Sequence, residues 1–381
     1  MVRGILVLTT TFPRWKNDST PAFVYELAKQ LARDFNINLV APHFRSSRER
    51  EIVDKINVYR FRYSKKERLC YEGGMLSNIK KNKKLMFQVP SLVWNMFKTS
   101  SKIIKRKKIS LIHAHWILPS GLVALWLKRL YNIPYIITVH GSDIHSTGYK
   151  SLKKSILKEA SVVNVVSNGL KKEVLKLVPN ANVIVCSMGI HVNQFQVKKN
   201  KNKNPVLLFV GRLTPEKGTI ILIKAMANVI REYKKTKLLI IGDGISKNRL
   251  INLTKMFGLW RNISFLGAKP HKKLSEYYSD ADIFILPSLR EGFGLTLLEA
   301  MAAKVPVIGS KISGISEIIQ DNKQGLLFEK ANSAILSNKI ISLLKDKKLK
   351  NKLIKNGSRF VKNYDWKVIA DKFKKIYLGL K

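Results

Sequence analysis

Cysteine is nearly absent from this 381-residue sequence. Its two cysteines, Cys70 and Cys186, lie far apart, and no Cys-x-x-Cys pair or Cys/His spacing typical of a metal site occurs. Neither a disulfide framework nor a structural metal is therefore expected, and two reduced thiols in a cytoplasmic protein are the simplest interpretation.

Long hydrophobic segments are missing as well. The longest uncharged stretch, Ile109–Leu127, contains His113, His115 and the helix-breaking Pro119. A membrane-spanning helix would carry both imidazoles into hydrocarbon, which is costly, so no transmembrane segment is expected. The N-terminal residues MVRGILVLTTTFPRW have too short an apolar run for a signal peptide and predict a first buried strand.

Acidic residues are scarce: 25 Asp and Glu stand against 70 Lys and Arg, a formal net charge of +45. Such a charge attracts nucleic acid, anionic lipid or phosphorylated substrates, although AT-rich coding sequence also produces an excess of Lys. Residues 45–108 hold 19 Lys and Arg against five acids, with aromatic and apolar residues between them. This mixture favours a membrane face over merely solvated charge or a nucleic-acid surface.

What is present predicts two α/β domains, because the chain is long enough for two cores and short apolar runs alternate with helical patterns. In the first half the predicted strands are Gly4–Thr10, Ile37–Ala41, Leu111–Trp116, Tyr135–His140, Val162–Ser167 and Val183–Ser187. In the second half they are Val206–Val210, Leu238–Ile241, Ile263–Leu266, Ile283–Leu286 and Pro306–Gly309. Helices are expected over Pro21–Phe35, Ile220–Tyr233 and Leu297–Ala303.

A polar segment separates the two halves. Val197–Asn204 consists of Lys and Asn after its first residue and precedes Pro205, so it is the predicted linker. We expect Rossmann-like domains over 1–198 and 205–355, with a ligand cleft between the carboxyl ends of their strands. Residues 356–381 are predicted to be a helix that caps the second domain or crosses back to the first.

Glycines and glutamates follow the fourth predicted strand of the second half. Gly292 and Gly294 let the backbone approach a ligand, and a helix beginning near Leu295 would point its free amides at a phosphate. Glu291 and Glu299 flank this position. Carboxylates disfavour a bare anion, so the ligand should also offer hydroxyls, as a nucleotide sugar does. Alternatively, the two carboxylates are only a dipole partner and an exposed helix charge.

Two cations follow the first strand of the second half. Arg212 and Lys217, in the turn Gly211–Gly218, would lie at the carboxyl edge of the sheet and could hold a pyrophosphate leaving group without a metal. Gly242 and Ala268 end neighbouring strands and are expected on the same rim.

Together these residues resemble the family-4 glycosyltransferases of GT-B fold, the retaining group 1 glycosyl transferases. The resemblance covers the second half: the glutamate pair with seven residues between its members, the two cations, the run Pro306–Gly325 and the tail Tyr364–Trp366. In this family a final helix returns to the first domain.

The resemblance implies metal-independent, retaining transfer from a nucleoside-diphosphate sugar, with no cofactor. It assigns Glu291 to the donor sugar and Glu299 to the ribose. Arg212 and Lys217 would hold the pyrophosphate, and Gly211, Gly242 and Ala268 would lie on the nucleotide side. The amides that would meet sugar and phosphate are those of Gly292, Phe293, Gly294 and Leu295.

The first half contributes histidines. The segment Thr138–Asp143 resembles the family's strand-end His motif, in which His140 would reach the donor sugar and Asp143 would position His140 or the acceptor. His113 and His115 share one face of a strand, as metal ligands can, but no third ligand is evident. A wall of the acceptor pocket is the preferred interpretation.

The loop after the first strand departs from the family. Many members have a Gly-Gly pair there that meets the pyrophosphate, whereas this chain has Thr9–Pro21. Arg14 or the backbone of Ser19 and Thr20 are candidates to replace it. Thr11 and Arg14 are expected on the acceptor side of the site.

The sequence Asp280–Asp282 has the DxD shape of a Mn²⁺ site, but it leads directly into a buried strand. Asp282 is therefore predicted to be a residue at the start of that strand, without metal.

The predicted enzyme transfers a sugar to a lipid-linked acceptor or polysaccharide precursor of a cell-surface glycan, as a peripheral protein on the cytoplasmic face of the membrane. Its partners would be the donor, the acceptor and an anionic membrane, but not nucleic acid. The alternative is a basic nucleic-acid- or membrane-binding protein without transferase activity.

Overall fold

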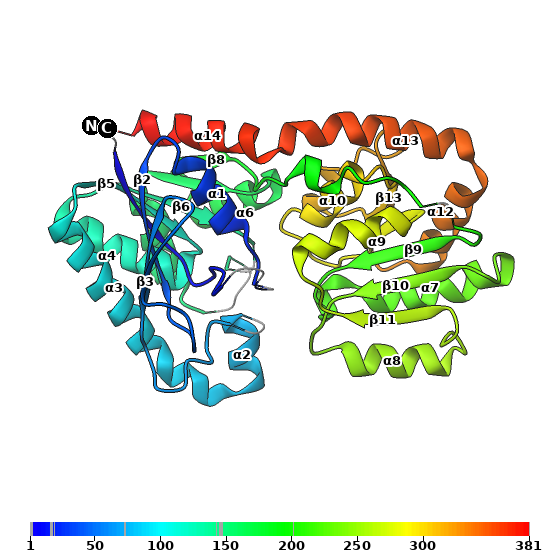
Figure 1. The fold of residues 1–381 in the computed structure, drawn as a ribbon, viewed down its shortest axis with the longest axis horizontal. Helices are drawn as coiled ribbons and strands as arrows, with labels where there is room; N and C mark the ends of the chain where they lie inside the picture. The colour runs from blue at the N-terminus through cyan, green and yellow to red at the C-terminus, as the bar shows by residue number, and fades with distance from the viewer. Residues whose placement is uncertain are drawn as a thin grey trace. The chain divides into compact units, whose positions relative to one another are not determined.

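The computed structural model describes residues 3–15, 18, 20–71, 74–141, 143–144, 148–200 and 202–380. The chain divides into two compact units, Met1–Met188 with Trp366–Lys381, and Gly189–Asp365. Each unit is built on a β-sheet of its own with helices packed around it (Figure 1). The predicted α/β class with two Rossmann-like sheets is confirmed.

The first unit contains an eight-stranded sheet in the order β3-β4-β2-β1-β5-β6-β7-β8, parallel except for the β3–β4 pair. Its strands are β1 (Gly4–Leu8), β2 (Asn36–Pro42), β3 (Arg50–Val53), β4 (Ile56–Phe61), β5 (Ile109–His115), β6 (Tyr135–Val139), β7 (Val162–Val165) and β8 (Val183–Val185). All six predicted strands are confirmed. The sequence analysis missed β3 and β4, which extend the sheet at one edge.

Helices cover both faces of this sheet, as in a doubly wound fold (Figure 1). They are α1 (Phe23–Leu31), α2 (Met75–Lys81), η1 (Lys83–Gln88), α3 (Val89–Arg106), η2 (Ile117–Gly121), α4 (Leu122–Tyr131), α5 (Lys150–Glu159), α6 (Asn168–Leu177) and the C-terminal α14 (Trp366–Gly379). The last of these packs on α1, and the Lys374 ammonium lies 2.6 Å from the Asp34 carboxylate.

The second unit has a six-stranded parallel sheet in the order β11-β10-β9-β12-β13-β14. Its strands are β9 (Val206–Val210), β10 (Lys237–Ile241), β11 (Ile263–Gly267), β12 (Ile283–Leu286), β13 (Val307–Ser310) and β14 (Leu326–Phe328). The five predicted strands are confirmed, and only the three-residue β14 was missed. The side chains of β12 are completely buried, as a strand covered on both faces requires.

The helices of the second unit agree with the predicted pattern at α7 and α10. In the described part of this unit they are η3 (Val192–Phe195), η4 (Pro215–Lys217), α7 (Thr219–Glu232), α8 (Lys247–Met256), η5 (His271–Lys273), α9 (Leu274–Asp280), α10 (Leu295–Ala302), α11 (Ser313–Ser316), α12 (Ser333–Lys345), α13 (Lys347–Phe360) and η6 (Val361–Tyr364).

The polar segment 197–204 lies against the second unit. The Lys199 ammonium donates to the backbone oxygens of Tyr278 and Ala281, and the Asn200 amide donates to the Ser279 oxygen at 3.2 Å. Burial lowers the pKa of Lys199 to about 8. These contacts place the segment inside the second unit, whose residues begin at Gly189.

Among the described residues, no helix combines the length and the apolar character that crossing a bilayer requires.

Candidate active site

The centre of the candidate site in the second unit is the junction of β9 and β12. These strands are parallel neighbours, while the chain that leaves β9 proceeds to β10 on the other side. Such a reversal of strand order is where open α/β sheets bind ligands, beyond the carboxyl ends of the strands. The loops that follow β9 and β12 therefore occupy the position where a nucleotide would be expected.

An ion pair joins these two loops. The Lys217 ammonium lies 2.5 Å from Oε2 of Glu291, and the Ser288 hydroxyl donates to the same oxygen at 3.2 Å. The Lys217 side chain is 18% exposed and that of Glu291 12%. The structure thus brings together two predicted site residues 74 positions apart. The contribution of Ser288 was missed.

The backbone connects the same loops. The Leu289 amide donates to the Glu216 oxygen at 2.7 Å. Because this bond fixes one loop against the other, the separation of Lys217 and Glu291 is set by main chain as well as by charge. Arg212 is exposed next to these loops at the end of β9.

Helix α10 begins beside this pair. Its N-cap, Gly294, has a φ of +101°, a left-handed conformation that favours glycine. The amides of Leu295 and Thr296, which open α10, are suited to an anion, whereas the Leu297 amide already donates to the Gly294 oxygen at 2.9 Å. Phe293 is buried with its ring 5.5 Å from that of Tyr364, which anchors the turn.

Glu299, in the second turn of α10, is not an exposed helix charge. It is buried, and its carboxylate accepts hydrogen bonds from the Tyr278 hydroxyl at 2.9 Å and from Nε2 of His271 at 2.8 Å. The sequence analysis missed both partners. Ala268 was selected because it directly follows a predicted strand, and His271 lies only three residues further on, so the same reasoning could have found it. Tyr278 does not follow a strand, so its position in the sequence gave no indication of this contact.

The glycines at the ends of β9 and β10 approach each other closely. A side-chain Cβ on Gly242, whose φ is +142°, would lie 1.9 Å from the Gly211 oxygen. Only glycine allows this contact. Ala268 is exposed at the end of β11, the next strand in the sheet. Gly211, Gly242 and Ala268 thus follow three adjacent strands.

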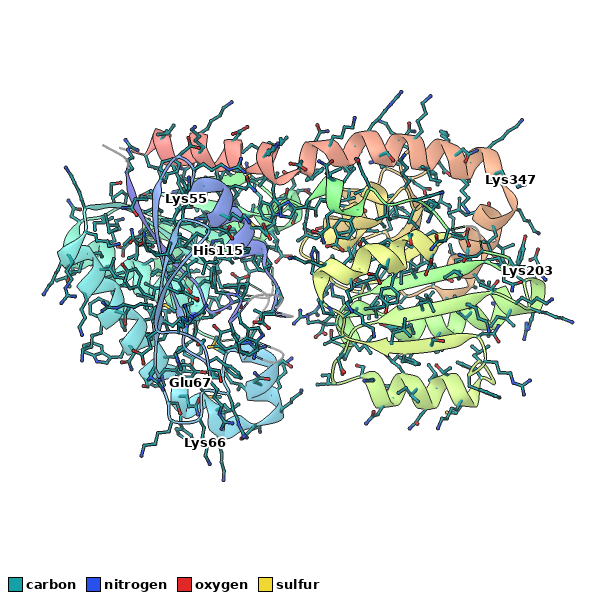
Figure 2. The ribbon with its side chains drawn as sticks, viewed as in Figure 1. Lys55, Lys66, Glu67, His115, Lys203 and Lys347 are labelled. Carbon is teal, nitrogen blue, oxygen red and sulfur yellow. The ribbon has the colours of Figure 1, made fainter. Side chains whose placement is uncertain are left out.

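In the first unit, His115 ends β5 and His140 follows β6. Nδ1 of His115 and Nε2 of His140 are 3.1 Å apart, one donating to the other, and the rings are stacked. The rings of Phe23 and Trp116 also lie against His140. His115 is enclosed within the unit (Figure 2).

Burial determines the protonation of these imidazoles. It lowers the pKa of His140 to about 3 and that of His115 well below its ordinary value, with neighbouring histidines adding to the shift at His115. Both rings are therefore neutral at physiological pH.

His113 is occupied by protein contacts on both ring nitrogens. Nδ1 lies 2.6 Å from the Tyr377 hydroxyl, and Nε2 lies 2.7 Å from the Thr138 hydroxyl. Across the described part of the chain, no three His, Cys, Asp or Glu side chains are grouped as metal ligands would be.

Asp143 stabilises the loop that carries His140. Its carboxylate accepts the Ile117 amide at 3.1 Å and the Gly141 amide at 2.9 Å. Burial raises the pKa of Asp143, although the backbone hydrogen bonds oppose the shift. Asp143 thus holds the turns after β5 and β6 together, which agrees with a role in positioning His140.

The loop after β1 contains a closed charge pair. The Arg14 guanidinium lies 2.7 Å from the Asp18 carboxylate and packs against the rings of Trp15 and Phe44. Burial opposes ionisation of Asp18, but its bonds to Arg14 outweigh burial and lower its pKa to about 2. A phosphate would have to open this pair to reach Arg14.

The rest of this loop is less informative. The Thr11 amide donates to the Thr9 hydroxyl at 3.1 Å. Thr20 is described, and Ser19 lies outside the described residues.

Asp282 has the contacts of a residue that begins a strand. Its carboxylate accepts the Val206 amide at 3.0 Å and the Lys350 ammonium at 3.1 Å, directly before β12.

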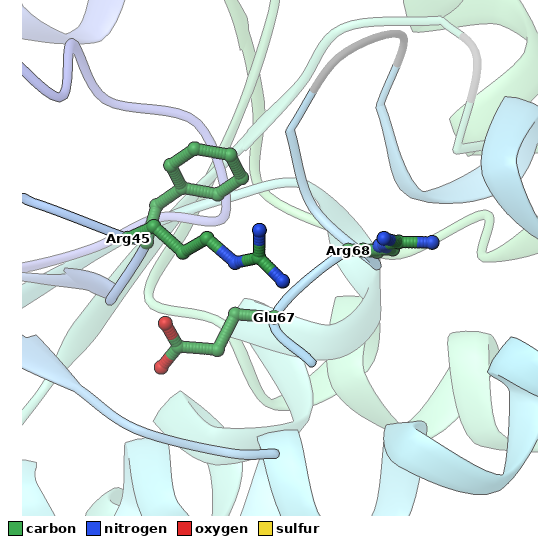
Figure 3. A pocket seen from close by; sticks show the side chains of 4 residues that line it. Arg45, Glu67 and Arg68 are labelled. Carbon is green, nitrogen blue, oxygen red and sulfur yellow. The ribbon is translucent and has the colours of Figure 1, made fainter. Parts of the chain in front are cut away.

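A small pocket of about 250 Å³ lies beyond β2 and β4, where the sequence analysis placed no site. Phe44, Arg45, Glu67 and Arg68 line it (Figure 3). The buried Glu67 carboxylate lies 2.7 Å from Nδ1 of His43, which holds it in place.

Comparisons with known proteins agree with this geometry. Residues 21–194 match the family described as Glycosyltransferase Family 4, and residues 192–360 match Glycosyl transferases group 1. An uncharacterized glycosyltransferase of Methanocaldococcus jannaschii is 30% identical over 319 residues, which cover 83% of this chain and 88% of that protein.

Two solved structures show the same fold. Sucrose-phosphate synthase from Thermosynechococcus elongatus has a TM-score of 0.83 at 23% identity and covers 99% of both chains. Anabaena HepE in complex with UDP and glucose has a TM-score of 0.74 at 18% identity, again over 99% of both chains.

Fold and family matches define the class of this molecule as a glycosyltransferase of GT-B fold. Within that class, the chain belongs to the family-4 glycosyltransferases. The predicted resemblance is confirmed, and the comparisons give no support to a binding protein without transferase activity.

Proposed function

We propose that the protein transfers a sugar from a nucleoside-diphosphate donor with retention of configuration and without a metal, to a lipid-linked acceptor or glycan precursor at the cytoplasmic membrane face. The observation that carries this proposal is the Lys217–Glu291 pair at the β9–β12 junction, beside the N-terminus of α10.

This pair suits a donor that carries both phosphate and hydroxyl groups. When a pyrophosphate binds, its oxygens compete with Glu291 for the Lys217 ammonium. Glu291 then has an oxygen free to accept a hydroxyl of the donor sugar. The Lys217–Glu291 ion pair is thus converted into two contacts with the donor, one with its pyrophosphate and one with its sugar.

The charge that develops in the transition state is negative and lies on the leaving nucleoside diphosphate. Lys217, Arg212 and the free amides of α10 supply fixed positive potential at that place, the role that a metal ion has in other transferases. As the bond from the anomeric carbon to the phosphate oxygen breaks, the acceptor oxygen bonds to the same face of that carbon. Its proton passes to the departing phosphate, so no protein nucleophile is required.

His140 acts in this proposal as a neutral hydrogen-bonding group. With a pKa of about 3 it is a poor proton acceptor, so it is not assigned the role of general base. Its bond to His115 engages Nε2 of His140 and leaves Nδ1 to contact a substrate.

The test is a thermal-shift screen of the purified protein in EDTA against UDP, GDP, ADP and their sugars. UDP comes first because HepE was solved with it. We expect a selective rise in Tm with one nucleotide. The matching donor is then offered to acceptors with EDTA present, and NMR should show the anomeric configuration of the donor in the product. An inverted product, or activity that requires added metal, would contradict the mechanism.

A further inference from the structure

The region from α2 to α4 has no acidic residue. Between Glu72 and Asp143 the sequence contains 12 Lys and Arg and no Asp or Glu. On α2, η1 and α3 the basic side chains are Lys80, Lys81, Lys83, Lys84, Lys98, Lys102, Lys105 and Arg106, all exposed. None of them forms an ion pair with a described residue, so their charge is uncompensated by neighbouring carboxylates.

Large apolar side chains are exposed among these cations. Phe87 is 86% exposed at the end of η1, and Trp94 is 59% exposed seven residues later on α3. Met86 beside Phe87 is exposed as well. Because residues seven apart share a helix face, Phe87 and Trp94 lie along one side of the continuous η1–α3 segment.

Ring contacts extend this surface across two helices. The ring of Trp94 lies 5.7 Å from that of Phe97, whose other neighbour is Trp126 of α4 at 5.9 Å. Leu130, one turn after Trp126, is also exposed. Figure 1 shows α3 and α4 next to each other in the first unit. We call this surface the basic aromatic face; it comprises Met86, Phe87, Trp94, Phe97, Trp126 and Leu130 with the eight cations named above.

The core does not require these side chains. The opposite side of α3 supplies Leu92, Met96 and Ile103, all buried, so the helix is anchored without its exposed aromatics. An exposed apolar patch within a field of one charge sign has a cost in water and marks a surface that is covered by a partner.

We propose that the basic aromatic face docks onto an anionic lipid bilayer. The cations would lie at the headgroups, and the Trp and Phe rings would enter the interface, where amphipathic aromatic side chains are favoured. This inference deepens the proposed function, because it names the surface by which the enzyme would reach a membrane-borne acceptor.

Other occupants fit the face less well. A second copy of this chain would bring two surfaces of the same sign together, which is unfavourable. A nucleic acid would match the charge and could stack bases on Phe87 and Trp94, but it would leave the exposed Met86 and Leu130 side chains without an apolar partner. Burial in a bilayer accounts for the charge and the apolar side chains together.

The test is co-sedimentation with extruded vesicles of phosphatidylcholine, alone or with about 30% phosphatidylglycerol. We expect binding to the anionic vesicles only. The double variant Phe87→Ser/Trp94→Ser should reduce the partition coefficient at least about tenfold, since both side chains are exposed. The quadruple variant with Gln in place of Lys80, Lys81, Lys83 and Lys84 should weaken binding and reduce its dependence on salt.

A matched control lies on the second unit. Trp260 is 61% exposed, close to the value for Trp94, and Trp260→Ser should leave vesicle binding unchanged. Each variant is checked by circular dichroism and by its thermal shift with the donor nucleotide, neither of which should change. Donor binding that fails while vesicle binding persists would contradict the proposed function alone.

The docking proposal is overturned if the double variant binds as the wild type does, if phosphatidylcholine alone suffices, or if an equal loss with Trp260→Ser shows that binding is non-specific. Tighter binding to duplex DNA or RNA than to anionic vesicles, abolished by the same variants, would assign the face to nucleic acid instead.

Discussion

Among the residues that the structure describes, the Lys217 ammonium pairs with the Glu291 carboxylate, and the donor would offer it a second, more negative partner. We therefore predict that Lys217→Ala lowers kcat by about a hundred- to a thousandfold, the usual result of removing one fixed group that stabilises transition-state charge. Transfer is measured at saturating donor. Because the pair lies at the edge of the sheet and not in the apolar core, the Tm should change little.

Lys247 provides the control for that variant. Its ammonium lies 3.0 Å from the Asp243 carboxylate, so it too pairs with an acid near the end of a strand of the second sheet. Lys247→Ala removes the same charge from the protein without touching the β9–β12 junction. Loss of activity in both variants would point to net charge rather than to the position of Lys217.

The candidate residues could be predicted from the sequence where each one follows a recognisable strand. Parallel strands end at one edge of a sheet, so Lys217 and Glu291 could be assigned to a common rim. Their direct contact could not be predicted, since it depends on β9 and β12 being neighbours in the sheet. The contact between the Tyr278 hydroxyl and Glu299 could not be predicted either, because the sequence around Tyr278 indicates only that this residue belongs to the core.

At the scale of elements, the contact between β5 and the C-terminal helix depends on a neutral histidine. Burial, together with the nearby His140, lowers the pKa of His113 from 6.5 to about 3, and its Nδ1 bonds the Tyr377 hydroxyl of α14. Between these two pH values the unfolded chain binds a proton that the folded protein does not. The free energy of unfolding must therefore decrease as pH falls from 6.5 toward 3.

We predict that His113 alone accounts for about 2 kcal/mol of the stability lost between pH 7 and pH 5. Urea unfolding of the wild type and of His113→Gln at both pH values measures this share. The variant is less stable at pH 7, but its loss on acidification should be smaller by that amount. An identical loss in both proteins would show that His113 does not couple folding to pH.

The elements themselves were predictable to the extent that burial leaves a pattern. Strands buried on both faces, such as β6 and β12, are apolar throughout and were found. At the edge of the sheet β3 alternates between exposed and half-buried residues, and β14 has only three residues, so neither has a long apolar run. The polar Lys/Asn composition of 197–204 predicted a solvated linker. Composition alone does not reveal that the Lys199 ammonium would be buried against backbone oxygens of the second unit.

At the scale of the whole molecule, charge is the dominant feature. The surplus Lys and Arg side chains behind the net charge of +45 repel one another. Folding brings these cations closer together than they are in the unfolded chain. Salt should therefore stabilise this protein. Raising NaCl from about 0.01 M to about 0.15 M shortens the Debye length from about 30 Å to about 8 Å, which screens the repulsion between distant cations.

We predict that the Tm rises by roughly a few degrees over this range, equivalent to about 1 kcal/mol or more. A neutral osmolyte at equal osmolality controls for solvent effects unrelated to charge. Anionic vesicles at low salt should give a comparable rise, because the bilayer would neutralise part of the same charge. A Tm that falls with salt would mean that the ion pairs, such as Lys217–Glu291, contribute more to stability than the surplus of cations takes away.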